Sequence, residues 1–278
     1  MTKNSLYRIS ELLIILLKFA KMSLKRTLEY KFDKTFVAIA IFCREMISVA
    51  VIFLILTRFV EIKGWGYKEM FFLYSFLFLS YSVFVFFFAG LRDFANMIYS
   101  GEFDRFLTRP LGLMYQIIAA KIDFSATLGH GIVGIILFVN TAFSVGIVWN
   151  ARNILYYICA LLGGAIIQAS IFLFSACFSF WTVKTDNLRN LMFFNARRIS
   201  GYPISFYPGM IQKMIMFVIP FAFVNYFPAQ YFLKKPEMLM FWNGYPYLTP
   251  LVAAIMFVLV YFFWKQGVRR YSSTGTPM

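Results

Sequence analysis

Six long stretches of this chain carry almost no charge, and each is long enough to cross a lipid bilayer. They cover residues 36–59, 70–91, 124–148, 154–183, 214–233 and 247–264. The hydrocarbon core is about 30 Å thick and needs about 20 helical residues to cross it. Backbone amides in lipid must be hydrogen-bonded within their own segment, so each stretch is expected to be a helix. The sequence therefore predicts an all-α integral membrane bundle of six transmembrane helices.

The composition leaves no room for a soluble domain. Charged residues make up 14% of the 278 residues, whereas soluble domains carry about 25%. Residues 1–278 are therefore expected to form a single membrane domain. We find no catalytic constellation and no G-x-x-x-x-G-K-[ST] sequence that would cradle the phosphates of ATP. The chain is accordingly not expected to be an enzyme.

The net charge of +15 is distributed unevenly across the expected membrane. With the N-terminus placed inside, 20 of the 27 Lys and Arg residues fall on the inner side and six on the outer side, with Arg44 left in the membrane. Lys and Arg mark the cytoplasmic loops of membrane proteins. This distribution predicts that both termini are cytoplasmic, and it explains the positive charge without a nucleic-acid partner.

The two ends of the chain depart from a plain series of spans. Residues 1–34 are expected on the cytoplasmic side, with an amphipathic helix over 5–31 that lies in the headgroup region. The alternative for this helix is a straight extension of the first span. Near the other end, Pro220 and Pro228 lie inside the fifth uncharged stretch and are expected to break it. Residues 227–249 are then predicted to form a kinked, partly re-entrant outer segment.

Few residues within the spans can carry chemistry. The single histidine, His130, lies in the third stretch without an acidic residue in the same span. It either relays protons or, as we favour, bonds to a backbone carbonyl or a neighbouring span. The cysteines at 43, 159 and 177 show no metal-ligand spacing, so no metal site is expected.

The most specific local feature is an inner loop that reads SGEFDRFLTRPL over residues 100–111. Gly101 permits a sharp break after the second span. Glu102 and Asp104 suit the positive end of a new helix. Pro110 disfavours helical geometry at Arg109 and so ends that helix.

The same loop has an apolar edge, because Phe103, Phe106 and Leu107 recur at helical spacing. Arg105 lies among them. The pattern predicts a short, stiff amphipathic helix between two spans. It could be a turn at the membrane surface, or it could dock into a soluble partner.

This loop resembles the cytoplasmic loop of permease subunits of type-2 ABC exporters, in particular the viologen-exporter-type branch. Residues 64–74, with GWGYKEM followed by FLY, resemble the start of that family's second span. Residues 202–208 and 217–229, which read YPISFYP and FVIPFAFVNYFPA, resemble its most distinctive block. The likeness extends from about residue 29 to residue 270.

The resemblance implies six spans with both termini inside, in a multi-pass protein of the bacterial plasma membrane. It also implies a second permease chain, identical or paralogous, and a separate ABC ATPase subunit that holds ATP and Mg, so this chain binds no cofactor itself. The coupling helix would be the loop after the second span, through Gly101, Glu102, Phe103, Asp104, Arg105, Phe106, Arg109 and Pro110. ATPase closure would push on it.

Arg44 and Glu45 depart from the family pattern, because they lie in the middle of the first span. A charge at a helix centre costs about 2.5–3.5 kcal/mol on insertion scales. Side chains adjacent in sequence point about 100° apart on a helix, so each residue is expected to need a partner elsewhere. One hypothesis places them at the interface between two permease chains or in a central cavity. In the other, Arg44 extends toward the cytoplasm and Glu45 finds a hydrogen bond within the bundle.

Two other classes of function remain open from the sequence. An ion-gradient-driven secondary transporter would need ionisable residues within the membrane, and Glu45 is the only acidic residue deep in a span. A membrane scaffold or sensor subunit is the third class. Co-purification with a P-loop ATPase would separate the exporter from both.

Overall fold

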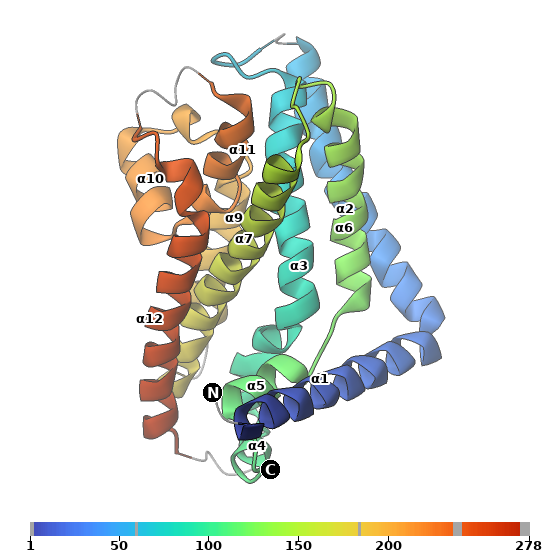
Figure 1. The fold of residues 1–278 in the computed structure, drawn as a ribbon, viewed down its shortest axis with the longest axis vertical. Coiled ribbons are helices and arrows are strands. Elements are labelled where there is room, and N and C mark those ends of the chain that lie inside the picture. The colour runs from blue at the N-terminus through green and yellow to red at the C-terminus, as the bar shows by residue number, and fades with distance from the viewer. Residues whose placement is uncertain (1–2, 59–60, 183–184, 236–240, 273–278) are drawn as a thin grey trace.

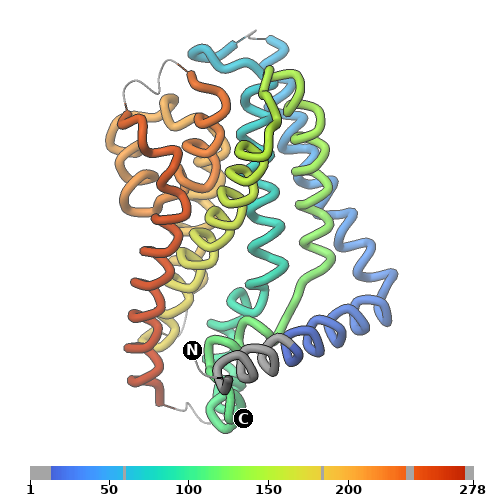
Figure 2. Tube along the Cα trace, in the orientation of Figure 1, coloured from blue at the N-terminus to red at the C-terminus, as the bar shows by residue number. Residues whose placement is uncertain are grey.

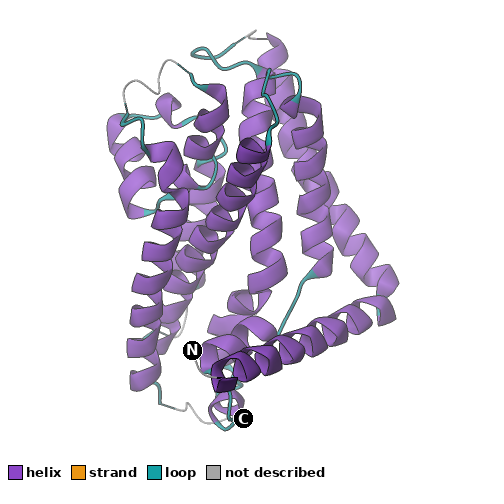
Figure 3. Ribbon diagram, viewed as in Figure 1, coloured by secondary structure: helices purple, strands orange, loops and turns teal. Residues whose placement is uncertain are grey.

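The computed structural model describes residues 3–58, 61–182, 185–235 and 241–272, which are almost entirely helical (Figure 3). In these ranges the only β-type pairing is an isolated bridge between Ile62 and Trp65. The helices are α1 (Lys3–Glu29), α2 (Lys31–Arg58), α3 (Tyr67–Tyr99), α4 (Asp104–Leu107), α5 (Leu113–Ala119), α6 (Phe124–Ala142), α7 (Ala151–Cys177), α8 (Asp186–Arg189), α9 (Ala196–Ile199), α10 (Gly209–Lys213), α11 (Tyr226–Leu233) and α12 (Thr249–Arg270). Short 3₁₀ and π segments join them: η1 (Phe178–Phe180), η2 (Asn190–Asn195), η3 (Ile204–Phe206), η4 (Met214–Val218), η5 (Phe221–Phe223) and η7 (Tyr245–Leu248).

Five of the described helices are long and apolar enough to cross a membrane. They are Lys31–Arg58, Tyr67–Tyr99, Phe124–Ala142, Ala151–Phe180 and Tyr245–Arg270. They run between two ends of one bundle (Figure 1). We call the end where α4 meets Tyr271 the near end, and the end where Gly64 meets Lys235 the far end. The all-α membrane bundle predicted from the sequence is confirmed, with five such helices.

Helix α3 forms the centre of the bundle, where it packs on α5, α6 and α7. Its interface with α7 is polar as well as apolar, because Gln168 Nε2 donates to Ser80 Oγ at 2.9 Å. Its interface with α6 includes a bond from Ser82 Oγ to the carbonyl of Thr127 at 2.8 Å. Close approach through small residues and hydrogen bonds between helices are what hold helices together where lipid supplies no hydrophobic drive.

The uncharged stretch 214–233 is interrupted at Pro220, where the sequence predicts a break, and it does not cross the bundle as a single helix. The π segment η4 ends at Val218, the backbone of the next residue, Ile219, leaves the helical region, and Pro220 follows. Proline removes a backbone donor and clashes with the preceding turn, so the helix cannot continue. The chain resumes as η5 and α11, and α11 ends at Lys234 in a left-handed conformation.

These pieces form a hairpin over residues 209–233, both ends of which lie at the far end (Figure 2). Lys63 donates to the carbonyl of Ser205 at 3.3 Å just before the hairpin, and Lys235 donates to the carbonyl of Gly64 at 2.6 Å just after it. At the tip, Thr249 Oγ1 donates to the carbonyl of Phe223 at 3.0 Å. The hairpin therefore enters and leaves the bundle by the same end.

Residues 185–206 lie between the fourth and fifth predicted spans, where the sequence predicts an inner loop, but they run through the bundle from the near end to the far end. The chain leaves the near end at Phe180, and Phe193 packs between α3 and α7 against Phe84 and Phe172. The sequence conceals this segment because four charged residues lie within it: Asp186, Arg189, Arg197 and Arg198.

Helix α1 crosses the near end beneath α5 and α6, as the dark blue ribbon in Figure 1 shows. The helix predicted over 5–31 is thus present, while its place at the membrane surface stays a prediction. Burial raises the pKa of the Tyr115 hydroxyl on α5, an effect that the backbone of Leu16 on α1 offsets in part. Residues 1–2, 59, 183 and 236–240 of the predicted elements fall outside the described ranges.

Candidate functional site

The connection between α3 and α6 forms the near end of the bundle. Gly101 adopts a φ of +72°, a left-handed conformation that glycine adopts without strain, and so turns the chain sharply after α3. The predicted break at Gly101 is confirmed. The helix that follows is only α4, Asp104–Leu107, and Arg109 and Pro110 belong to the turn beyond it.

Phe103 points into the bundle. Its side chain is fully buried, and its ring centroid lies 5.7 Å from that of Phe94, 6.0 Å from that of Phe180 and 4.9 Å from that of Tyr271. The Tyr271 hydroxyl also donates to Asp104 at 2.9 Å. The predicted apolar edge therefore does not face a partner at this residue, because Phe103 fastens the connection to α3 and to the end of α12.

The outward surface of the connection is mainly polar. Its exposed residues are Glu102, Arg105, Leu107, Thr108, Arg109 and Pro110. Phe106 is half-buried, and the guanidinium of Arg109 lies 5.8 Å from its ring centroid. A soluble partner would thus meet charges of both signs around one exposed leucine.

Helix α5 holds this connection against α3. Gln116 on α5 donates to the carbonyls of Phe106 at 3.1 Å and Leu111 at 2.8 Å, which fixes both ends of the turn after α4. On its other side, α5 meets α3 at Gly90, where an added Cβ would clash with the carbonyl of Ile117. Backbone lies against backbone here, so α4, α5 and the last turns of α3 form one unit.

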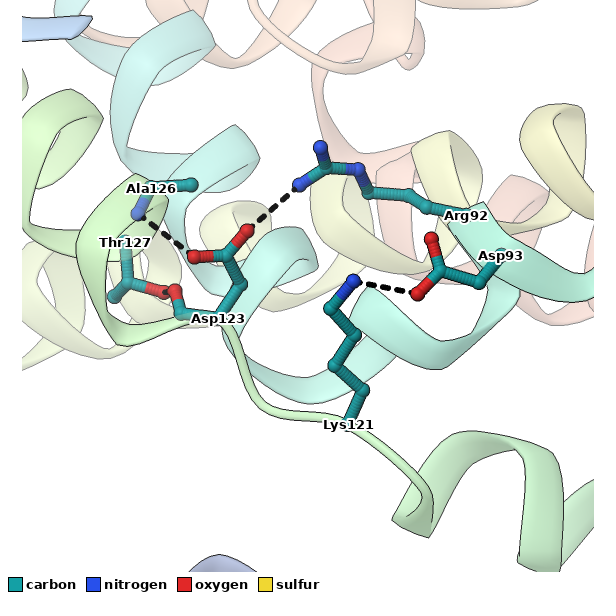
Figure 4. Close-up of polar contacts among 6 residues, drawn as sticks. All are labelled: Arg92, Asp93, Lys121, Asp123, Ala126 and Thr127. Carbon is teal, nitrogen blue, oxygen red and sulfur yellow. Dashed lines mark hydrogen bonds and ion pairs between the residues drawn. The ribbon is translucent and has the colours of Figure 1, made fainter. Parts of the chain in front are cut away.

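Two ion pairs tie that unit to the start of α6 (Figure 4). Arg92 Nη1 lies 3.2 Å from Asp123 Oδ2, and Lys121 pairs with Asp93. Asp123 also caps α6, because its carboxylate accepts from the backbone N–H of Ala126 at 3.0 Å. Movement of the connection must therefore carry the ends of α3 and α6 with it.

We expect Phe103→Ala to destabilise the protein by about 3 kcal/mol or more, since it empties a buried aromatic site. Phe106→Ala is the matched control, because its ring is half-buried and its loss removes fewer contacts. Thermal unfolding of the purified variants measures the difference. Equal melting temperatures for both variants would contradict the anchoring role of Phe103.

Arg44 and Glu45 interact with each other, contrary to the expectation that adjacent residues would not pair. Arg44 Nη2 lies 2.6 Å from Glu45 Oε1, because the long arginine side chain folds back along α2. The Arg44 side chain is 65% exposed and the Glu45 side chain 8%. His130 Nδ1 on α6 lies 3.6 Å from the same carboxylate oxygen, so His130 meets an acidic residue of a neighbouring helix.

Beside this pair is a cavity of about 540 Å³. It is lined by Arg44, Glu45, Ile47, Ser48, Val51, Ile52, Tyr74, Leu77, Phe78, Tyr81, Phe194, Arg197, Arg198 and Tyr202. The side chains come from α2, from α3 and from the segment 194–202. The sequence singled out Arg44 and Glu45, whereas the part of residues 194–202 in the wall was missed, although the Arg-Arg pair at 197 and 198 lies there between aromatic residues.

The two prolines predicted to break helices have different positions. Pro220 lies at the break between η4 and η5, at the inner tip of the hairpin. Pro228 lies in the first turn of α11, where its missing N–H leaves no helical hydrogen bond unmade. In the described part of the chain no group of three or more His, Cys, Asp and Glu side chains could hold a metal ion.

Comparison with known protein families matches residues 42–275 to the family described as "ABC-2 family transporter protein". The chain belongs to the ABC-2 transporter family. ABC-2 proteins are the membrane components of ABC transporters, so this chain is a multi-pass permease subunit rather than a secondary transporter, and the family implies an ABC ATPase partner. No curated protein and no solved structure matched the chain.

Proposed function

We propose that this ABC-2 permease is a subunit of a type-2 exporter and that residues 101–110 are its coupling segment. Two permease chains, identical or paralogous, enclose the export pathway in a bacterial plasma membrane. Two ATPase subunits bind at the near end and hold ATP and Mg. Closure of the ATPases presses on the coupling segment and tilts the helices joined to it.

The observation that carries this proposal is the mechanical continuity of the near end. Phe103 joins the coupling segment to α3 and to Tyr271, while the Arg92–Asp123 and Lys121–Asp93 pairs join α3 to α6. Because the coupling segment is held to α3 and α6 in this way, a force on the exposed face of α4 moves those helices as well. Coupling between distant sites requires such an element with two discrete arrangements.

Charge supports a cytoplasmic near end. Arg197 and Arg198 line the cavity and Lys213 lies in the hairpin, so these three residues leave the inner set counted from the sequence. Of the 17 Lys and Arg residues that remain in the inner set, 13 belong to α1, to the 92–121 region and to the end of α12, against six in the outer set. We therefore place both termini in the cytoplasm.

The path of the chain supports six crossings of the membrane. The five long helices and the segment 185–206 together cross the membrane six times. Because this number of crossings is even, the end of α12 lies on the same side as α1. The hairpin 209–233 then lies in the outer half of the membrane. The resemblance to viologen-exporter-type permeases supports this architecture and carries no information about cargo.

The test is a crosslink from the exposed face of the coupling segment. We expect Leu107→Cys, with a short bifunctional reagent in native vesicles, to reach the co-expressed ATPase, because Leu107 is exposed beside Arg105. Arg152→Cys is the control, since Arg152 is exposed at the other end of the bundle. Absence of a crosslink at Leu107, or an equal yield at Arg152, would refute the docking of an ATPase at this segment.

A further inference from the structure

The cavity beside Arg197 has the size of a ligand site. Its volume of about 540 Å³ falls within the range of about 300–1,000 Å³ that small-molecule sites occupy. One wall is aromatic, with Tyr74, Phe78 and Tyr81 from α3 and Phe194 opposite. The cavity lies along α3 between Tyr74 and Tyr81, and thus at membrane depth.

The charge of the cavity wall is unbalanced. Three arginines line the cavity, Arg44, Arg197 and Arg198, against a single acidic residue, Glu45. Glu45 already accepts two bonds from Arg44, at 3.1 and 2.6 Å. Arg197 and Arg198 therefore have no anion of their own within the cavity wall.

Arg197 lacks hydrogen-bond partners for part of its guanidinium group. Its Nε and Nη2 atoms are buried and have no hydrogen-bond partner among the described residues. A buried donor without an acceptor costs about 1–3 kcal/mol, and more when it is charged. Nε and Nη2 are neighbouring donors of one guanidinium plane, and such a fork matches the two oxygens of a carboxylate or phosphate. The Arg197 side chain thus lacks an acceptor, and an oxyanion matches both its charge and the geometry of its fork.

An organic cation does not fit the same cavity. The aromatic face that would hold a cation is already covered, because the Arg197 guanidinium lies 4.1 Å from the ring centroid of Tyr81 and 5.6 Å from that of Phe78. Any further positive charge would also meet the surplus of arginines. The apolar body of a ligand, in contrast, finds Leu77 and Ile52 in the wall.

We propose that this cavity binds an anionic amphiphile, a carboxylate or phosphate on an apolar or aromatic body, with the oxyanion paired with the positive charge of Arg197. The inference deepens the proposed export function, on which it rests, by assigning the class of cargo. The same chemistry would suit an anionic lipid, and the experiment below separates the two sources.

The test uses the permease with its ATPase in nanodiscs of phosphatidylcholine. Two fluorescent probes share one aromatic body: pyrenebutyrate, which is anionic, and pyrenebutyltrimethylammonium, which is cationic. Fluorescence anisotropy, corrected with empty nanodiscs, measures their binding. We expect pyrenebutyrate to bind at least tenfold more tightly than the cation and Arg197→Gln to weaken it at least tenfold. Equal binding of both probes, or an unchanged affinity in Arg197→Gln, would overturn the proposal.

Two further variants distinguish the loss of the binding site from a general loss of folding. Arg189→Gln is the matched control, since Arg189 also lies over an aromatic ring, at 5.9 Å from Phe172, but outside the cavity. It should leave pyrenebutyrate binding unchanged. Glu45→Gln removes the only carboxylate of the wall and should strengthen pyrenebutyrate binding several-fold, a change that damaged folding cannot produce. Weaker binding in Glu45→Gln, or an equal loss in Arg189→Gln, would contradict the assignment.

The source of the anion is decided by two readouts on the same complex. Stimulation of ATP hydrolysis by pyrenebutyrate, lost in Arg197→Gln, identifies the ligand as cargo. Native mass spectrometry measures bound phosphatidylglycerol. If the wild type retains this lipid and Arg197→Gln loses it, the ligand is a resident lipid. That result would support the site and overturn its assignment to cargo. Since probe binding needs no contact at Leu107, its failure beside a successful ATPase crosslink would overturn this inference alone.

Discussion

Reversal of charge on the coupling segment, by Glu102→Lys or Arg105→Glu, is expected to separate ATP hydrolysis from movement of the permease. Both side chains are exposed on the near end, so folding should be unaffected. A partner surface complementary to them would meet like charge in the variants, which weakens coupling rather than folding. Couplings between sites amount to about 1–3 kcal/mol, or 5–150-fold.

Hydrogen–deuterium exchange measures this effect without knowledge of the cargo. In the wild-type complex, ATP should change amide exchange at residues 61–66 of the far end. In the variants the ATPase should still hydrolyse ATP, while that change should fall at least fivefold. Arg152→Glu reverses an exposed charge away from the near end and should preserve it. A normal far-end response in both Glu102→Lys and Arg105→Glu would rule out this segment as the route of coupling.

Gly90→Ala is expected to detach α5 from α3. The new Cβ would lie 2.9 Å from the carbonyl carbon of Ile117 and closer still to its oxygen. Both are backbone atoms and cannot rotate away, so α5 must shift and release the bonds that Gln116 makes to the carbonyls of Phe106 and Leu111. Overpacking in close-packed sites typically lowers the free energy of unfolding by about 1–3 kcal/mol. Because the new Cβ meets backbone atoms, we expect a loss at the upper end of that range for Gly90→Ala.

Thermal unfolding and the Leu107→Cys crosslink together measure the consequence. We expect a lower melting temperature and a reduced yield of the crosslink to the ATPase. Gly112→Ala provides the control, because an added Cβ at Gly112 meets nothing closer than 4.0 Å, at Tyr115. A Gly90→Ala protein that melts and crosslinks like Gly112→Ala would show that the close approach of α3 and α5 has no role.

The long helices could be predicted because lipid leaves one solution for an uncharged stretch of sufficient length. The same rule failed for residues 214–233, which have the composition of a span. Pro220 indicates the break in this stretch, but neither proline nor hydropathy indicates that the chain turns back there as a hairpin. It failed in the opposite sense for residues 185–206, which contain four charged residues and yet run through the bundle, with Arg197 packed over the ring of Tyr81.

The candidate site was predictable in part for a similar reason. Gly101 and Pro110 act locally, so their sequence marks the turn and the end of the coupling segment. The orientation of Phe103 depends on Phe180 and Tyr271, which are distant in sequence, and helical spacing alone cannot say which face is buried. Likewise, periodicity gives the directions of Cβ atoms and not the reach of a long side chain, which is why the Arg44–Glu45 contact was missed.

The contacts of the hairpin 209–233 also set an order of assembly. Its tip bonds to Thr249 on α12, and its end bonds through Lys235 to Gly64, 171 residues earlier. During synthesis the ribosome makes α12 after the hairpin, so the hairpin cannot bond to Thr249 until the start of α12 has also been made. Premature termination before Thr249 would leave its apolar tip uncovered, and such a product should be recognised by membrane quality-control proteases.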